Sequence, residues 1–395
     1  MFQFMTATRI IFGEGALSHS LSMLNQFGYS ALVVTGKDEQ RAAPLLGYLK
    51  QQGMRYQQLS VHGEPFIAMV EEMAAAGRVF KPDMVIAVGG GSVMDVGKAL
   101  SALIPNQGSV YDYVEVVGRA LPLTAKPLPC IAVPTTAGTG SEVTRNAVLI
   151  SAQENVKAAL RSTDLIPDMA IIDPTLTYGT DKELSARCGM DAFTHLMEAY
   201  VCGDPNPLTD MVCEEGLRRL APAILHACEE DDPKARADMA FASMLGGMAQ
   251  SNAKLGAAHG LAAALGGMLD APHGAITAQL APYVMAENIL AAREAGRITL
   301  LNRYRQLAVI LTGRQNAEPS DGIVWVQRTL KRLSLPSLCH YGLCEAVFDD
   351  VAVQALRSSS IKGNAMPLNH ERLVNIMRRM CKQEPIHEHS HSLSD

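Results

Sequence analysis

Four side chains able to bind a metal lie in segments that are otherwise apolar. Asp191 and His195 stand in GMDAFTHLMEAY, His259 in GAAHGLAAALGG and His273 in DAPHGAITAQL. A lone charged or imidazole group would be costly to bury there, and Asp191 and His195 share one helix face at their spacing of four. Three imidazoles and one carboxylate suit Fe(II) or Zn(II) better than Mg or Ca. Satisfied core histidines would explain any one of these residues, but four in the same half of the chain favour a metal site.

The second half of the chain has a helical texture. After about residue 182, strand-like runs nearly vanish. Asn206 and Asp232 each precede a proline, as a capping residue does at a helix start, and 300–311 and 321–333 show apolar residues at helical spacing. We therefore predict a helical domain over 183–385, followed by a flexible polar tail over 386–395.

The first half alternates strand-like and helix-like segments. Apolar runs typical of buried strands cover 30–35, 56–61, 84–88 and 130–133, with helical patterns at 42–52 and 67–76 and an extended edge segment at 8–12. Such alternation predicts a mostly parallel sheet with helices on both faces. We therefore expect an α/β domain over 1–182, and an α/β plus all-α fold for the whole chain.

A glycine triplet follows the strand at 84–88, in GGGSVMDVGK. Gly90 and Gly91 would let backbone N–H groups approach a pyrophosphate at a helix N-terminus. Ser92 and Asp95 have the spacing of residues that cap a helix. Because Met94 stands where the last glycine of G-x-G-x-x-G would fall, a simple tight turn explains the triplet equally well.

A second polar loop, PTTAGTGSEVT, begins at Pro134, directly after the strand at 130–133. Ligands of open α/β sheets bind at the carboxyl ends of the strands. The hydroxyl side chains and glycines of this loop are therefore placed for ligand binding, although any one threonine there would also fit a hydrogen-bonded turn.

These motifs, in this order and at this spacing, resemble the iron-containing (group III) alcohol dehydrogenase family, from IIFGEGA near the start to APYVMAEN past residue 280. The resemblance implies a dinucleotide-binding α/β domain, a helical domain, and a metal in the cleft between them. It implies NAD or NADP as cofactor and Fe(II) as metal, with Zn(II) as the alternative. By position, the metal-binding and catalytic residues are Asp191, His195, His259 and His273. The cofactor-binding residues are Gly90, Gly91, Ser92, Asp95, Thr135, Thr136 and Thr139, with Gly36 at the end of the first buried strand.

The sequence departs from the family pattern at two positions. Many members carry a second histidine four residues after the third metal ligand, where this chain has Ala263. The proton handling or substrate contact attributed to that histidine is therefore in doubt. Many NAD-preferring members carry an aspartate where this chain has Gly36, followed by Lys37. An aspartate there would repel a 2′-phosphate, so NADP fits as well as NAD, although Asp38 or Glu39 would also serve to bind the ribose.

The implied reaction is reversible hydride transfer between the nicotinamide and an alcohol, aldehyde or ketone. The alternatives are a maleylacetate reductase-like or glycerol dehydrogenase-like sibling, and a dehydroquinate synthase-like lyase that uses NAD only transiently. The complete ligand set disfavours maleylacetate reductases and non-catalytic NAD-binding sensors. The lyase needs a strongly basic pocket, for which the helical half has no suitable cluster of residues.

Composition disfavours several other classes of function. The 395 residues are 48% hydrophobic and carry a net charge of −6, without a Lys/Arg cluster, which disfavours nucleic acid as a partner. No apolar run approaches the length of a membrane span. The eight cysteines include no C-x-x-C pair and read as reduced thiols. We expect a cytoplasmic enzyme that acts on a small molecule, and by resemblance a homodimer.

Overall fold

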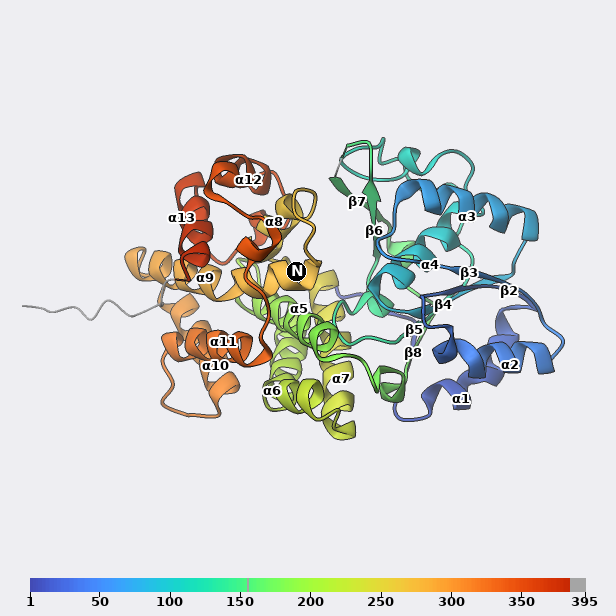
Figure 1. The fold of residues 1–395 in the computed structure, drawn as a ribbon, viewed down its shortest axis with the longest axis horizontal. Helices are drawn as coiled ribbons and strands as arrows, with labels where there is room; N and C mark the ends of the chain where they lie inside the picture. Colours follow the sequence, from blue (N-terminus) through green and yellow to red (C-terminus); the bar gives the residue numbers. More distant parts are fainter. Residues whose placement is uncertain (155, 384–395) are drawn as a thin grey trace, which may run out of the picture.

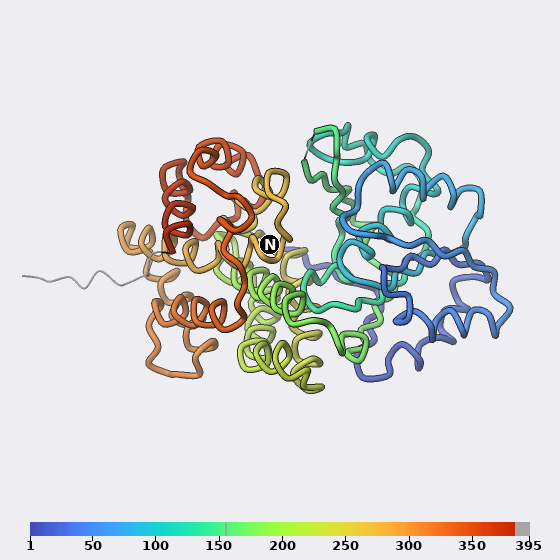
Figure 2. Tube along the Cα trace, in the orientation of Figure 1, coloured from blue at the N-terminus to red at the C-terminus, as the bar shows by residue number. Residues whose placement is uncertain are grey.

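The computed structural model describes residues 1–154 and 156–383. An α/β half and a helical half lie side by side, and the N-terminus lies against the helical half (Figures 1 and 2). The strands are β1 (Arg9–Phe12), β2 (Ser30–Thr35), β3 (Arg55–Ser60), β4 (Met84–Gly89), β5 (Cys130–Pro134), β6 (Asn146–Ser151), β7 (Val156–Arg161) and β8 (Met169–Ile172).

Six strands form one sheet in the order β1-β8-β5-β4-β2-β3, and every neighbouring pair is parallel. After β3 the chain crosses back over β2 to β4, so the direction of winding reverses between β2 and β4. At such a reversal the loops that leave adjacent strands diverge and open a crevice for a ligand. In the neighbouring pair β4–β5, Gly89 lies opposite Pro134. The loop that starts with the glycine triplet (89–91, the glycine loop) and the loop PTTAGTGSEVT (134–144, the threonine loop) therefore begin side by side.

Helices cover both faces of this sheet (Figure 1). The helices of this half are α1 (Ala16–Ser20), α2 (Ala43–Gln51), α3 (Ile67–Phe80) and α4 (Gly91–Leu103). Helices α3 and α4 pack on one face with Leu32 and Val85, and α1 and α2 pack on the other with Val33 and Ile86. Central strands buried on both faces need continuous apolar sequences, which explains the Val-, Ile- and Ala-rich runs.

The other half is built from helices: α5 (Lys182–Val201), α6 (Pro207–Glu229), α7 (Pro233–Asn252), α8 (Ala257–Leu265), α9 (His273–Glu294), α10 (Ile298–Thr312), α11 (Pro319–Leu333), α12 (Phe348–Ala355) and α13 (His370–Cys381). The side chains of Asn206 and Asp232 cap α6 and α7 as predicted. The predicted fold class, an α/β half followed by an all-α half, is confirmed. The domain limits at 182 and 183 stay a prediction, and the predicted tail over 386–395 lies outside the described residues.

Two details differ from the sequence analysis. The prediction that Ser92 and Asp95 cap α4 is wrong, because the N-cap is Gly90, two residues before Ser92, and no side-chain capping bond is formed. The carboxylate of Asp95 instead accepts hydrogen bonds from Ser141 Oγ at 2.8 Å and from the backbone N–H of Val148 at 3.2 Å. The sequence analysis also missed the antiparallel hairpin β6–β7 and the strand β8.

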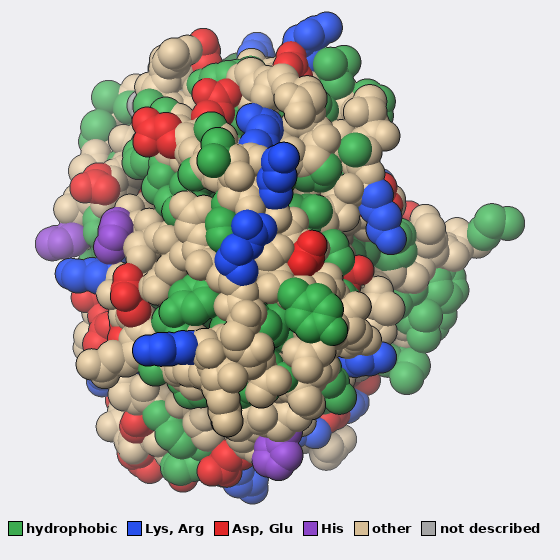
Figure 3. All heavy atoms as spheres, turned by 90° about the vertical axis from the view of Figure 1, so that its right-hand side faces the viewer, with side chains coloured by type: hydrophobic (Ala, Val, Ile, Leu, Met, Phe, Trp, Pro, Cys, Tyr) green, Lys and Arg blue, Asp and Glu red, His purple; other side chains and the backbone are tan. Residues whose placement is uncertain are grey.

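The surface of the α/β half carries mixed charge. On the face shown in Figure 3, Lys and Arg side chains are scattered among hydrophobic and acidic ones. Within the described residues, none of the helices combines the length and the apolar character that crossing a bilayer requires.

Candidate metal and dinucleotide site

Three of the four predicted metal ligands meet in a buried cluster. Asp191 and His195 lie one turn apart on α5, and His259 lies in the first turn of α8. One ligand atom from each lies within 4.8 Å of the other two. His195 Nδ1 is 3.9 Å from Asp191 Oδ2, and His259 Nε2 is 3.9 Å from Asp191 Oδ1. These separations exceed hydrogen-bond length but suit atoms that share one metal ion.

The hydrogen bonding and the protonation of these histidines fit a metal site. His195 Nδ1 and His259 Nε2 are buried and have no hydrogen-bond partner. Buried polar atoms are nearly always paired, so two unpaired ring nitrogens beside one carboxylate fit the binding of a metal ion. Burial lowers the pKa of His195 to about 4, which keeps the ring neutral at neutral pH, as metal binding requires. The donor set of carboxylate and imidazole suits Fe(II) and Zn(II).

The fourth predicted ligand, His273, stands at the open edge of this cluster. It is the first residue of α9, and its Nε2 lies 3.7 Å from Asp191 Oδ1. Its side chain is 35% exposed, whereas that of Asp191 is 4% exposed. The next residue, Gly274, packs so closely on α5 that a Cβ atom there would lie 2.5 Å from the carbonyl oxygen of Arg187. Glycine at 274 therefore lets the start of α9 approach Asp191.

Sequence analysis missed the residue that orients His259. Glu198 accepts a hydrogen bond from His259 Nδ1 at 2.7 Å and others from the backbone N–H groups of Gly256 and Ala258, at the start of α8. Burial opposes charge on His259, but the hydrogen bond and charge of Glu198 raise its pKa. A carboxylate on the second ring nitrogen of a histidine ligand fixes the ring and increases its basicity. The spacing of Glu198, one further turn along α5 from His195, was the available signal.

The glycine loop leaves the start of α4 open to an anion. Gly90 is the N-cap and Gly91 the first helical residue, and the backbone N–H groups of this turn lack a side-chain cap. A helix N-terminus of this kind binds phosphate through its N–H groups and dipole. Ser92, the next residue of this turn, is partly exposed.

The threonine loop lies directly against the glycine loop. A Cβ atom on Gly91 would lie 2.8 Å from Thr139 Cγ2, and one on Gly90 would lie 3.4 Å from Thr136. Thr136 and Thr139 are partly exposed beside the glycines, whereas Thr135 is buried. Gly36, at the carboxyl end of β2, lies near the same helix start, because a Cβ atom there would be 3.6 Å from Val93. The predicted cofactor residues therefore gather at one edge of the sheet.

The buried side chain of Lys98 anchors the threonine loop. Lys98 Nζ donates to Ser141 O at 2.9 Å, to Thr144 Oγ1 at 2.8 Å and to Asn146 O at 2.6 Å. The Asp95 carboxylate lies 3.6 Å from the same ammonium group. Asp95 is thus hydrogen-bonded to the threonine loop through Ser141 and to β6 through Val148, so it helps to position the predicted cofactor site.

The threonine loop also joins the two halves. Gly140 adopts φ +61°, and a Cβ atom on Gly247 of α7 would lie 2.2 Å from its carbonyl oxygen. Gln250 Nε2 of α7 donates to Thr139 O at 2.7 Å. The backbone of Gly138 lies close enough to the His195 ring to affect its pKa. The same loop therefore lies against the glycine loop at one end and near the metal cluster, meaning the cluster of Asp191, His195 and His259, at the other.

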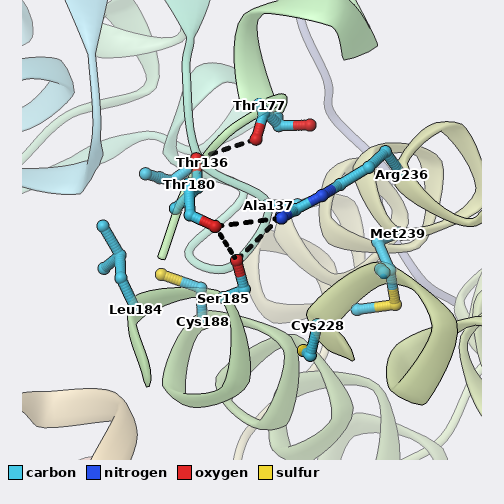
Figure 4. A pocket seen from close by; sticks show the side chains of 11 residues that line it. Thr136, Ala137, Thr177, Thr180, Leu184, Ser185, Cys188, Cys228, Arg236 and Met239 are labelled. Atoms are coloured by element: carbon cyan, nitrogen blue, oxygen red, sulfur yellow. Dashed lines mark hydrogen bonds between the residues drawn. The ribbon is translucent and has the colours of Figure 1, made fainter. Parts of the chain in front are cut away.

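A pocket lies beside this junction (Figure 4). Arg236 of α7 reaches across it and donates to Ser185 Oγ at 2.8 Å and to the carbonyl of Thr180 at 3.1 Å. The other lining residues come from the threonine loop and from the helices around it: Thr136, Ala137, Thr177, Leu184, Cys188, Ala227, Cys228 and Met239. The predicted cofactor residue Thr136 therefore lines a pocket between the two halves.

The metal cluster is open on the side of the β6–β7 hairpin. Ala263, one turn beyond His259, is exposed, whereas the other residues of α8 are buried. Lys157 of β7 reaches the end of α8, where its Cε would lie 3.4 Å from a Cβ atom on Gly266. Its Nζ pairs with Glu64 at 3.4 Å. Sequence analysis missed Lys157, which is recognisable only once the hairpin is placed.

Comparisons with known proteins agree with this geometry. The family model for iron-containing alcohol dehydrogenase matches residues 7–174, and the model for the C-terminal region of Fe-containing alcohol dehydrogenases matches residues 185–381. The chain is 32% identical to a 1,3-propanediol dehydrogenase of Klebsiella pneumoniae, over 96% of this chain and 98% of the relative. It is 30% identical to an NADPH-dependent butanol dehydrogenase of Clostridium saccharobutylicum, over 95% of this chain and 97% of the relative.

Solved structures share the fold over nearly the whole chain. A crystal structure of 1,3-propanediol oxidoreductase matches with a TM-score of 0.89 at 31% identity, covering 96% of this chain and all of that one. An alcohol dehydrogenase from Oenococcus oeni matches with a TM-score of 0.88 at 30% identity, over 96% and 100%. The chain therefore belongs to the iron-containing alcohol dehydrogenase family, and it is an NAD(P)-dependent oxidoreductase that interconverts alcohols and their carbonyl counterparts.

Proposed function

We propose that Asp191, His195, His259 and His273 together bind one Fe(II) ion and form the catalytic centre, with Zn(II) as the alternative metal. The observation that supports this most strongly is the pair of orphaned, buried imidazole nitrogens beside the Asp191 carboxylate. His273 completes the set from the exposed side, 3.7 Å from the same carboxylate. When bound, the metal supplies a Lewis acid that lowers the pKa of an alcohol hydroxyl and polarises a carbonyl group.

The residues of the chain supply position and exclude water. The N–H groups at Gly90 and Gly91 bind the cofactor pyrophosphate, with Ser92, Thr136 and Thr139 beside it. The threonine loop, which spans from the glycine loop to His195, sets the distance between the nicotinamide and the metal cluster. Since Ala263 has no titratable group, the proton of the alcohol leaves to water on this exposed side.

We further propose NADPH as the preferred reductant. The carboxylates of the loop after β2 already have partners, because Asp38 pairs with Arg41 at 3.0 Å and Glu39 accepts from Ser60 at 2.8 Å. Gly36 presents no carboxylate to a ribose, and Lys37 beside it is exposed. A cation near the ribose favours a 2′-phosphate. The NADPH-dependent butanol dehydrogenase is a relative with this preference.

We propose a small alcohol or aldehyde as substrate. Relatives that align over most of this chain act, by their names, on 1,3-propanediol and butanol. The small side chain of Ala263 leaves space one helical turn from His259, which suits an unhindered alkyl chain. The family match supports this reaction over a lyase activity.

We also propose that the enzyme is cytoplasmic and homodimeric. All eight cysteines are free thiols, as is usual in a reducing compartment. The edge strand β1 pairs with β8 alone within the sheet, so its outer edge is available to a second chain. Light scattering coupled to size exclusion tests the dimer, which a monomeric mass would contradict.

Steady-state turnover tests the proposed reaction. Metal-loaded enzyme is assayed with NADPH and with NADH against a series of linear aldehydes. We expect turnover with short linear aldehydes and a higher kcat/KM for NADPH than for NADH. Absence of turnover with every carbonyl tested would reject the proposed reaction, and a higher kcat/KM for NADH would reject the cofactor preference.

A further inference from the structure

Three of the eight cysteines lie together at the C-terminal end of the helical half, away from the residues assigned to catalysis. Cys339 and Cys344 are exposed and Cys381 is half-buried. The other five, at positions 130, 188, 202, 213 and 228, are buried or half-buried. Both exposed thiols of the chain therefore belong to this C-terminal group.

Two of these three thiols are in contact. Cys339 lies in the 3₁₀ turn Leu338–Tyr341, and Cys381 is the last residue of α13. The Sγ of Cys339 donates to the carbonyl oxygen of Cys381 at 3.9 Å, and the two thiols lie close enough to influence each other electrostatically. The residues are 42 positions apart, so tertiary structure alone brings them together.

Independent contacts hold both segments in place. Leu338, beside Cys339, is completely buried. Arg378 of α13 donates to Glu345 at 2.9 Å, which ties this helix to the segment that follows the turn. A disulfide needs two Cβ atoms already close together, because its geometry is specific. The packing around Cys339 and Cys381 keeps the Cys339 thiol in contact with the backbone of Cys381 in the reduced protein.

We propose that Cys339 and Cys381 form a reversible disulfide under oxidising conditions. With hydrogen peroxide as oxidant, the Cys339 thiolate attacks one peroxide oxygen and releases water after protonation, which leaves a sulfenic acid on Cys339. The Cys381 sulfur then displaces the hydroxyl from that sulfenic acid, loses its proton and releases a second water. Two thiols have lost two electrons and two protons, and one peroxide has become two waters.

The surroundings assign the order of these steps. Cys339 is exposed, so a small oxidant reaches it first. Burial, together with the neighbouring Cys339, raises the pKa of Cys381 to about 12. Cys381 therefore keeps its proton at neutral pH and acts second, because the thiolate is the reactive form of cysteine.

The disulfide would close a loop whose residues contact α8, the helix that carries His259. The closed segment contains Asn364, whose Oδ1 accepts from the backbone N–H of Ala257 at 3.0 Å, at the start of α8. It also contains α12, which packs on both α8 and α13. Oxidation would thus restrain the segment that supports α8 and hold the end of α13 in place.

The test uses the full-length, metal-loaded protein, fully reduced and then exposed to hydrogen peroxide. Free thiols are counted after denaturation, and peptides are mapped by mass spectrometry without reduction. We expect the count to fall from eight to six, a single Cys339–Cys381 peptide, and full recovery with dithiothreitol. Amide hydrogen exchange of α13 should become slower on oxidation.

Matched variants separate the proposed pair from its neighbour. Cys339→Ser and Cys381→Ser should each abolish the cross-linked peptide, whereas Cys344→Ser, at a thiol that is also exposed, should behave as the wild type. Cys339→Ser alters an exposed position, so it keeps the test valid even if Cys381→Ser folds poorly. A cross-link that involves Cys344, no thiol loss, or an oxidised Cys339 beside a free Cys381 would each overturn the proposal.

Discussion

At the scale of single residues, Glu198 links the metal cluster to the backbone of the helix that carries His259. Its carboxylate accepts from His259 Nδ1 at 2.7 Å and from the N–H groups that open α8. Glu198→Gln keeps the shape of the side chain but removes its charge. We predict a loss of metal affinity of about 10- to 100-fold, because the partner of a histidine ligand tunes its basicity.

Competition with a chromogenic chelator measures this affinity without reference to turnover. Glu214→Gln serves as the control, because Glu214 is a partly exposed carboxylate on α6 that pairs with Arg218 at 2.7 Å. An affinity for the metal in Glu198→Gln equal to that of the control would show that Glu198 only stabilises the fold.

The proposed preference for NADPH depends most directly on a single residue, Gly36. A Cβ atom at this position would meet Val93 at an ordinary 3.6 Å, so Gly36→Asp fits without strain. The new carboxylate would accept from ribose hydroxyls and repel a 2′-phosphate. We predict that the ratio of kcat/KM for NADPH to that for NADH falls by about tenfold, equivalent to about 1.4 kcal/mol. An unchanged ratio would place the 2′-position away from Gly36.

Residue types alone were enough to predict the set of metal-binding side chains, but not the residues that hold those side chains in position. Histidines and an aspartate in apolar sequence stand out because unpaired burial is costly. Glu198 carries the same signal, since it lies in the apolar segment of Asp191 and His195, but it was overlooked, whereas Lys157 carries none, since lysine is common on hairpins. Their roles depend on which backbone N–H groups and which helix end lie opposite them, and only the fold determines this.

At the scale of elements, the contact between the threonine loop and α7 sets the spacing of the two halves. Gly247 has no room for a side chain, because a Cβ atom there would lie 2.2 Å from Gly140 O. We predict that Gly247→Ala lowers the free energy of unfolding by about 1–3 kcal/mol, as overpacking does. It should also raise the KM for NADPH, because Thr139 moves with the loop.

Gly47→Ala in α2 is the matched control, because a Cβ atom on Gly47 meets nothing within 4 Å. Alanine there should stabilise the helix by roughly 0.5–1 kcal/mol. Urea unfolding and cofactor titration measure both effects. If Gly247→Ala resembled Gly47→Ala in both measurements, the close contact would not set the spacing.

The apolar strands β2, β4 and β5 were predicted from the sequence, whereas the equally apolar β8 and the β6–β7 hairpin were missed. The predicted bounds of β2 match the structure, because a doubly buried strand has a uniform sequence. Strand β7 contains Lys157 and two alanines, residues that are depleted in strands, and it is stabilised by pairing with β6. Short-range pattern does not capture stability that comes from a partner strand.

At the scale of the whole molecule, buried charge beneath the site makes stability depend on pH. Burial raises the pKa of Glu142 from 4.5 to about 7, against the opposing effects of its own backbone N–H and of Lys98. A carboxyl group with a raised pKa in the folded state binds its proton more tightly when folded. Its stabilising effect is therefore complete below pH 4.5 and is lost as the pH rises towards 7.

Glu142→Gln mimics the protonated form and removes this dependence. We predict that the variant and the wild type differ little at pH 4.5 and that the variant becomes relatively more stable by pH 7, by up to about 3 kcal/mol. Chemical unfolding of both proteins across this pH range measures the difference. A difference that stays constant with pH, or that changes in the opposite direction, would contradict the raised pKa.

The arrangement of the two halves, a dinucleotide edge facing a metal cluster, follows from one loop that touches both. The metal content of purified variants tests this account most directly. Protein loaded anaerobically with Fe(II) and desalted should retain one metal ion per chain. His259→Ala should lose both the ion and NADPH-dependent aldehyde reduction, whereas His226→Ala, at an exposed histidine paired with Glu230, should keep both. Retention of the ion and of activity by His259→Ala would contradict the assignment of the catalytic centre.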